Sequence, residues 1–83
     1  MAFVVYIIYS KFLDKYYVGY TENIEVRITQ HNSGISTYTS KAKDWTLKYT
    51  ESFGDRLKAI ARENQIKKKK SRKYIEWLIN SNH

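Results

Sequence analysis

The feature that most constrains the fold is a seven-residue apolar run, residues 3–9, whose members are all β-branched or aromatic. Such residues favour strands, and because apolar side chains occupy both parities of the run, we expect a strand covered on both faces. The run is far shorter than the roughly 20 residues of a membrane-spanning helix, and no charged segment precedes it as in a secretory signal. The sequence therefore predicts a central strand in the core of a soluble, cytoplasmic protein.

A chain of 83 residues is long enough for one domain and too short for two, since compact domains usually contain roughly 50 to 200 residues. We therefore expect a single domain over residues 1–83. With 42% hydrophobic and 28% charged residues, the composition is that of a folded globule and argues against intrinsic disorder. The absence of cysteine excludes a disulfide framework and a thiolate zinc site, and it fits a reducing cytosol.

The net charge of +7 comes from 15 Lys and Arg residues against eight Asp and Glu residues. A surplus of this size implies a polyanionic partner, most often nucleic acid. Residues 56–73 contain nine of the basic residues and a single acidic one, Glu63. This clustering predicts a phosphate-binding surface, although lysines also favour the end of a helix through its dipole. The predicted phosphate contacts are Lys67, Lys68, Lys69, Lys70, Arg72 and Lys73, with Lys41 and Lys43 as further contacts from a loop.

The first half of the sequence has the pattern of a hairpin followed by a helix. A second β-rich run, residues 15–20, follows closely after residues 11–14, so a hairpin is the natural connection. Thr21 can cap a helix over residues 22–33, which has two glutamates in its first turn and isoleucines at helical spacing before a stop at Gly34. The polar segment 36–44 has no clear period, and we expect a mobile loop there.

The second half has the pattern of one strand followed by two helices. Four apolar residues alternate with polar ones, as in a strand with one face in water: Trp45, Leu47, Tyr49 and Phe53. Ser52 and Asp55 form a short variant of the capping box for a helix that ends near Lys69. Its apolar face is expected to consist of Leu57, Ile60, Ala61 and Asn64. Ser71 can cap a third helix with an apolar surface wide enough to dock, so the predicted order is ββαβαα.

The length of the hairpin loop predicts which side chains meet. A four-residue loop at residues 11–14 places Tyr6 opposite Gly19, and Tyr17 diagonally from Tyr6 on the same face, with Cβ atoms roughly 7 Å apart. Two phenol side chains would then share a surface beside a gap. The alternative is coincidence, because tyrosines are good strand formers.

Three further side chains can carry chemistry. Arg27 and His31 are one helical turn apart and can reach the same ligand. An arginine supplies a permanently charged fork for phosphate oxygens, and a histidine can move protons near neutral pH. The lone Glu63 can hold a magnesium ion that keeps most of its waters and takes phosphate oxygens as ligands. Structural interpretations remain open: a solvated helix face for the pair, and a salt bridge from Glu63 to Arg62 or Lys67.

Taken together, these spacings resemble the GIY-YIG nuclease superfamily over nearly the whole chain. In that family two short strands carry the two triplets of the name. Here the first triplet, Val4-Val5-Tyr6, keeps only the tyrosine, and the second is Tyr17-Val18-Gly19. Residues 17–34 and 62–68 are similar to small stand-alone members described as excinuclease-subunit-like. Many members have a further asparagine after the metal-binding glutamate, and we assign none in this sequence.

The resemblance implies an α+β GIY-YIG fold with a three-stranded antiparallel sheet flanked by helices. It also implies hydrolysis of a phosphodiester bond with one divalent metal ion, Mg²⁺ or Mn²⁺. By the same resemblance, Glu63 binds the metal, Arg27 holds the scissile phosphate, and Tyr6 and Tyr17 are the paired active-site tyrosines. Gly19 leaves room beside them. His31 matches a histidine that orients or helps to deprotonate a tyrosine.

The expected activity is that of a DNA endonuclease, structure-selective or nonspecific, linked to DNA repair or recombination and acting as a monomer. The general base stays open, since Tyr6, Tyr17 or His31 can take the proton from water. Three alternatives also stay open: an RNA-directed nuclease, a nucleic-acid-binding module without turnover, and a catalytic module that depends on a partner protein for substrate recognition.

Overall fold

The computed structural model describes residues 2–34 and 39–81. Within these residues three strands, β1 (Phe3–Ser10), β2 (Lys15–Thr21) and β3 (Thr46–Phe53), form one antiparallel sheet in the order β2-β1-β3. The helices are α1 (Ile24–Asn32), α2 (Arg56–Lys69) and α3 (Arg72–Ser81). The predicted α+β class and ββαβαα order are confirmed. None of the described helices has the length and apolar character needed to cross a membrane.

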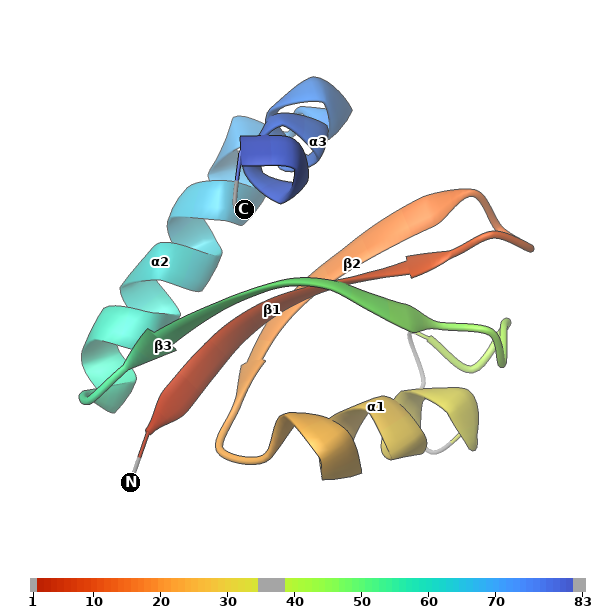
Figure 1. Cartoon of the computed structure of the whole chain (residues 1–83), viewed down its shortest axis with the longest axis horizontal. Helices are drawn as coiled ribbons and strands as arrows, with labels where there is room; N and C mark the ends of the chain where they lie inside the picture. The colour runs from red at the N-terminus through yellow and green to blue at the C-terminus, as the bar shows by residue number, and fades with distance from the viewer. Residues whose placement is uncertain (1, 35–38, 82–83) are drawn as a thin grey trace.

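The sheet separates two layers of helices. Figure 1 shows α1 on one side of the sheet and α2 with α3 on the other. The central strand β1 contributes to both layers, because successive side chains of a strand point to opposite faces. Val5 and Ile7 pack toward α2 and α3, whereas Tyr6 and Ile8 pack toward α1, and all four are at most 1% exposed. The prediction of a strand covered on both faces is confirmed.

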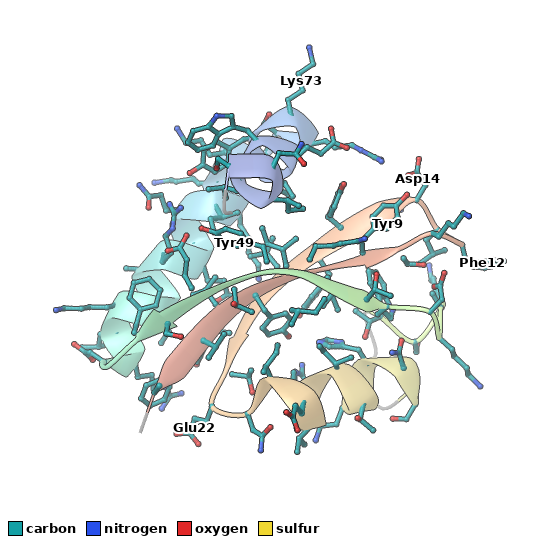
Figure 2. The ribbon with its side chains drawn as sticks, in the orientation of Figure 1. Tyr9, Phe12, Asp14, Glu22, Tyr49 and Lys73 are labelled. Atoms are coloured by element: carbon teal, nitrogen blue, oxygen red, sulfur yellow. The ribbon has the colours of Figure 1, made fainter. Side chains whose placement is uncertain are left out.

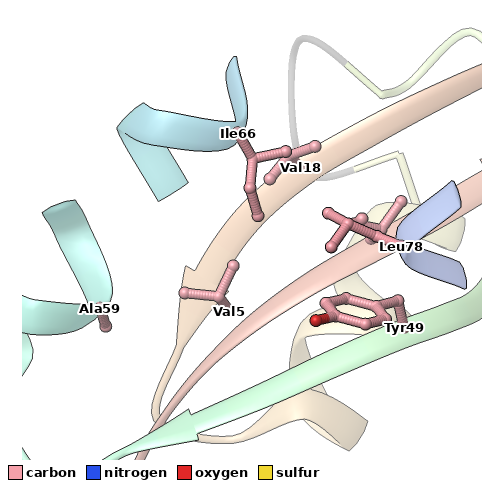
Figure 3. Close-up of a cluster of buried hydrophobic side chains, with 7 residues drawn as sticks. Val5, Val18, Tyr49, Ala59, Ile66 and Leu78 are labelled. Carbon is pink, nitrogen blue, oxygen red and sulfur yellow. The ribbon is translucent and has the colours of Figure 1, made fainter. Parts of the chain in front are cut away.

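Each side of the sheet has its own apolar cluster. The cluster beneath α2 and α3, drawn in Figure 3, contains Val5, Ile7, Val18, Tyr49, Ala59, Ile66 and Leu78. The cluster beneath α1 contains Tyr6, Ile8, Ala42 and Trp45, with Tyr17 and Ile28 packed against it. Tyrosines predicted for the site therefore lie in the core of the α1 layer, where neighbouring side chains restrict their movement.

The hairpin register is the predicted one. Tyr6 pairs with Gly19 and Ile8 pairs with Tyr17 across a loop at residues 11–14. Asp14 closes this loop with a left-handed backbone, φ 53°, a conformation that aspartate tolerates better than most residues.

Two of the predicted helix caps are wrong. Thr21 is the last residue of β2, and the Oδ1 of Asn23 accepts a hydrogen bond from the Val26 N–H at 3.2 Å, so Asn23 caps α1. Ser52 likewise belongs to β3, and Asp55 caps α2 by accepting from the Leu57 N–H at 3.0 Å. Strand β2 extends one residue further than expected, whereas β3 ends at the expected Phe53, and in both cases a later side chain able to cap begins the helix. Ser71 does accept from a backbone N–H of the first turn of α3, as predicted.

Two predicted apolar faces are also wrong. The register of β3 against β1 shifts between Ile7 and Ile8, whose partners are Tyr49 and Leu47, so Lys48 is the extra residue of a β-bulge. A bulge reverses the alternation of side chains beyond it, and Trp45 therefore lies in the α1 layer rather than beside Tyr49.

The buried face of α2 is not the predicted one either. Ala59 and Ile66 are its buried residues, whereas Leu57 is 73% exposed. Turning this face toward the sheet places the neighbouring Glu63, four residues after Ala59 and three before Ile66, beside the same surface.

The segment between α1 and β3 is only partly described. Its first expected residues, 36–38, lie outside the described residues. From Thr39 to Trp45 the segment forms no helix or strand, as expected, but Thr39 and Ala42 are only 0% and 4% exposed. Ala42 packs into the α1 layer, and Thr39 contacts His31 of α1.

Candidate active site

Two adjacent strands place two tyrosines together on the α1 face of the sheet. The ring centroids of Tyr6 and Tyr17 are 6.4 Å apart. Gly19 makes this packing possible, because a Cβ atom there would lie 2.6 Å from the Tyr6 hydroxyl oxygen and 2.8 Å from Cζ of the same ring. Any residue with a side chain would therefore displace Tyr6. The space that Gly19 leaves opposite Tyr6, predicted from the sequence, is occupied by the ring of Tyr6.

Helix α1 brings a buried histidine to these tyrosines. His31 is 0% exposed, and its Nε2 lies 2.8 Å from the Tyr6 hydroxyl oxygen. Its Nδ1 lies 2.6 Å from the hydroxyl oxygen of Thr39, which is itself fully buried. The ring of Tyr17 packs edge-on against His31, with centroids 5.0 Å apart. The structure thus forms a chain of polar contacts from Tyr6 through His31 to Thr39.

Both Tyr6 and His31 are neutral near pH 7. Burial, with a contribution from the positive charge of Arg27, lowers the pKa of His31 to about 4. Burial also raises the pKa of Tyr6 to about 12, against an opposing effect of the Arg27 guanidinium near its hydroxyl. A neutral imidazole has one donor and one acceptor nitrogen. The positions of the Tyr6 hydroxyl proton and of the single His31 N–H proton therefore depend on their hydrogen-bond partners.

Two proton arrangements satisfy both contacts. In one, His31 donates from Nε2 to the Tyr6 oxygen and accepts at Nδ1 from the Thr39 hydroxyl. In the other, Tyr6 donates to Nε2, 2.8 Å away, and His31 donates from Nδ1 to Thr39 Oγ1, 2.6 Å away. In this arrangement His31 Nε2 is ready to receive the proton of Tyr6.

Arg27 places a permanent positive charge beside these groups. It is one turn before His31 on α1, is partly buried, and donates from Nη1 to Gln30 Oε1 at 3.0 Å. Its charge lowers the pKa of both His31 and Tyr6. A guanidinium has five N–H donors in a fixed fork that matches phosphate geometry, so it can hold a phosphate close to the tyrosines.

Helix α2 contributes the acidic residue from the opposite layer. The carboxylate of Glu63, 13% exposed, accepts from Lys67 Nζ at 2.9 Å, and its negative charge contributes to the raised pKa of Tyr6. Lys67 Nζ in turn lies 5.8 Å from the ring centroid of Tyr17. Because β2 is an edge strand, side chains of α2 can reach past it to the tyrosines on the other face. Of the two predicted partners of Glu63, Lys67 is the one observed, since Arg62 pairs with Glu51 at 3.0 Å.

The donor set suits one particular kind of metal site. Among the described residues no group of three or more His, Asp or Glu side chains is arranged to hold a metal ion. A single carboxylate with oxygen chemistry fits a hard divalent cation that keeps several waters and takes phosphate oxygens from its substrate. Glu63 therefore fits such a cation, which would replace the Lys67 ammonium at the carboxylate.

The predicted phosphate contacts do not form one surface. The side chains of Lys41, Lys43 and Lys67–Lys70 are exposed, but Lys69 lies over the ring of Tyr74, 5.2 Å from its centroid. Figure 2 shows Lys73 projecting from α3 away from the sheet. Arg72 is held by Asp14 at 2.7 Å and by Glu76 at 3.3 Å. Lys67, Lys70 and Arg72 line a groove whose wall includes Tyr17.

Comparison with known proteins agrees with this arrangement. The family model of the GIY-YIG catalytic domain matches residues 2–75. A UPF0213 protein of Halobacterium salinarum is 42% identical over 53 residues, which cover 63% of this chain and 69% of that protein. A UPF0213 protein of Bacillus cereus is 38% identical over 65 residues, covering 74% of this chain and 68% of the relative.

The fold is also found in a solved structure. The solution NMR structure of a UPF0213 protein from Bacillus halodurans has a TM-score of 0.62 and 31% sequence identity to the chain. The match covers 99% of this chain and 86% of that one. With the family model spanning residues 2–75, the chain belongs to the GIY-YIG nuclease superfamily.

Proposed function

We propose that the chain is a metal-dependent endonuclease that hydrolyses phosphodiester bonds in DNA. The observation that supports this most directly is the chain of contacts from Tyr6 through His31 to Thr39. It lies beside the Arg27 charge and within the electrostatic influence of the Glu63 carboxylate. A proton acceptor, a phosphate-binding cation and a metal-binding carboxylate are the groups that phosphodiester hydrolysis requires.

In the proposed reaction Arg27 binds the scissile phosphate and stabilises the negative charge that develops on its oxygens. Tyr6 accepts a proton from the attacking water as it passes its own proton to His31 Nε2. The bond from the water oxygen to phosphorus forms, the bond from phosphorus to the 3′ oxygen breaks, and a proton from solvent completes the 3′ hydroxyl. The products are 5′-phosphate and 3′-hydroxyl ends.

Substrate binding would prepare His31 for this role. The charge of Arg27 contributes to the low pKa of His31 in the free protein. A phosphate bound to Arg27 compensates that charge, so the pKa of His31 rises when the substrate is present. Mg²⁺ or Mn²⁺ held by Glu63 would supply neutralisation of the leaving oxygen.

The test is cleavage of plasmid and branched DNA by the intact chain with Mg²⁺ or Mn²⁺. Glu63→Gln and Arg27→Ala are each expected to lower the cleavage rate by roughly 100-fold or more, with binding in the absence of metal largely retained. Glu25→Gln, an exposed glutamate of α1, is the matched control and should cut like the wild type. Unchanged cleavage by both site variants would refute the proposal.

One observation favours a second candidate, a nucleic-acid-binding module that does not cut alone or needs a partner protein. The Lys67 ammonium already neutralises Glu63 at 2.9 Å, so a metal must compete for this carboxylate. This candidate predicts no cleavage by the wild type with either metal, and an affinity for DNA that falls steeply with salt. Cleavage of RNA, measured in the same assay, decides whether the substrate is DNA or RNA.

The proposal also covers how the chain binds DNA, which DNA it cuts, and where and in what form it acts. The net charge of +7 supports binding through phosphates, and phosphate contacts carry no base preference. We therefore propose cleavage that depends on DNA structure, in repair or recombination, by a single cytoplasmic domain acting as a monomer.

A further inference from the structure

A groove of 640 Å³ lies between the edge strand β2 and the junction of α2 with α3. Its floor is apolar and comes from Val18, Ile66 and Ile75, whereas its rim carries Lys15, Lys67 and Lys70. The volume is within the roughly 300–1,000 Å³ of sites that bind small organic molecules. An apolar floor with a cationic rim suits a ligand that combines a flat apolar part with a phosphate.

The groove is continuous with the candidate active site. Tyr17 and Lys67 line the groove, and the same Tyr17 packs against His31 while the same Lys67 pairs with Glu63. Lys67 Nζ lies 5.8 Å from the Tyr17 ring centroid, at the boundary between the two sites. A nucleic-acid strand with its scissile phosphate near Arg27 and Glu63 would therefore continue into the groove.

The charges of the groove are unevenly compensated. Asp14, the acidic residue of its lining, is neutralised by Arg72 at 2.7 Å. Lys67 is paired with Glu63. Lys15 and Lys70 form no side-chain ion pair with any described residue. The groove thus keeps two uncompensated positive charges on its rim, which is complementary to a polyanion.

The backbone of Lys70 has a conformation that lysine rarely adopts. Lys70 follows the last turn of α2 with φ 48° and ψ 37°. This left-handed conformation disfavours residues with a Cβ atom, and glycine is the usual residue at such a position. A strained non-glycine residue that lines a groove beside a reactive centre is a candidate for ligand binding.

We propose that this groove binds an unpaired nucleotide next to the scissile phosphate. Its base or sugar lies on the apolar floor, and its phosphate is bound by Lys15 and Lys70. A base on this floor has left its partner strand, so the groove selects DNA with single-stranded or branched segments over continuous duplex. The inference rests on the proposed function and names the substrate feature that the site selects.

The test measures binding without metal, so that it does not depend on cleavage. Fluorescence anisotropy in EDTA gives the Kd of the full chain for a labelled single-stranded oligonucleotide and for a blunt duplex. Lys70→Gln is expected to weaken single-strand binding roughly five-fold and duplex binding much less. Lys58→Gln, at an exposed position of the same helix outside the groove lining, is the matched control and should change both affinities alike and only slightly.

A second variant uses the strained backbone. Lys70→Gly should lose the same single-strand affinity and yet raise the Tm, because glycine accepts the left-handed conformation. Equal losses for Lys70→Gln and Lys58→Gln, or equal losses on both kinds of DNA, would each overturn the proposal, and a lower Tm for Lys70→Gly would overturn its argument from the strained backbone. Absent cleavage with intact groove binding would instead refute only the proposed function.

Discussion

At the scale of single residues, Thr39 is the buried partner of the His31 nitrogen that does not face Tyr6. Its hydroxyl oxygen lies 2.6 Å from Nδ1, within hydrogen-bond distance. When Thr39 accepts the proton of Nδ1, the other nitrogen is left as an acceptor for the Tyr6 hydroxyl at 2.8 Å. The partner of a histidine fixes its tautomer and the orientation of its ring. Thr39 is therefore a positioning residue that acts through His31.

Thr39→Val should slow cleavage by roughly 10- to 100-fold, the range found for hydrogen-bond partners of metal-binding histidines. Valine has nearly the shape of threonine but leaves Nδ1–H without an acceptor, so the tautomer that accepts from Tyr6 is no longer favoured. Thr39→Ser keeps the hydroxyl and should restore most of the rate at an unchanged KM. Wild-type turnover by Thr39→Val, measured together with its Tm, would contradict the assignment.

The residues of the site differ in how far the sequence could predict them. Tyr6, Tyr17 and Gly19 follow from the period of strands and the length of one loop, and the structure has the predicted register. Thr39 lies in a polar segment without a period, so no local signal marks it, and its burial depends on packing against α1 and Trp45. The reach of Glu63 past β2 depends on the packing of α2, which the sequence pattern misplaced.

At the scale of elements, the wrong predictions share a physical cause. Elements were assigned from alternation and caps, which are local, whereas the ends of β2 and β3 are decided by pairing with β1. The bulge at Lys48 is invisible in the sequence, because apolar residues on both sides of it still fall on the same parity. Helix α2 has few apolar residues, and two of them, Ala59 and Ile66, decide which face is buried.

The cap of α1 gives a test at this scale. Asn23→Ala should lower the free energy of unfolding by about 1 kcal/mol, because the Val26 N–H loses the acceptor it has at 3.2 Å. Asn23→Asp keeps an acceptor, adds a negative charge at the N-terminus of the helix, and should unfold like the wild type. Urea denaturation of the three proteins measures the difference. A cap at Thr21, as the sequence suggested, would instead leave Asn23→Ala at wild-type stability.

At the scale of the whole molecule, stability and function depend on the same buried residues. The α1 layer has a small core, and Tyr6 of the site is part of it. Residues from both layers meet at the edge strand β2, where Lys67 of α2 approaches Tyr17. A change in the charge of a group in this core must therefore alter the stability of the fold as well as the chemistry of the site.

The stability of the molecule should fall as the pH drops from 7 to 5, because His31 is buried in neutral form. Its pKa is about 4 in the folded state and about 6.5 when unfolded, so between these values the unfolded state binds the additional proton. The carboxyl groups of Asp14, Asp44 and Glu51 have pKa values lowered from ordinary values of 3.8 to 4.5, so in the folded state they stay ionised above pH 5. The expected loss is about 2 kcal/mol at pH 5, measured by urea denaturation.

His31→Gln should remove most of this dependence of the unfolding free energy on pH. NMR of the wild-type imidazole should show no protonation until below pH 5. A pH dependence that persists in His31→Gln, or an imidazole that titrates near 6.5, would contradict the buried neutral histidine.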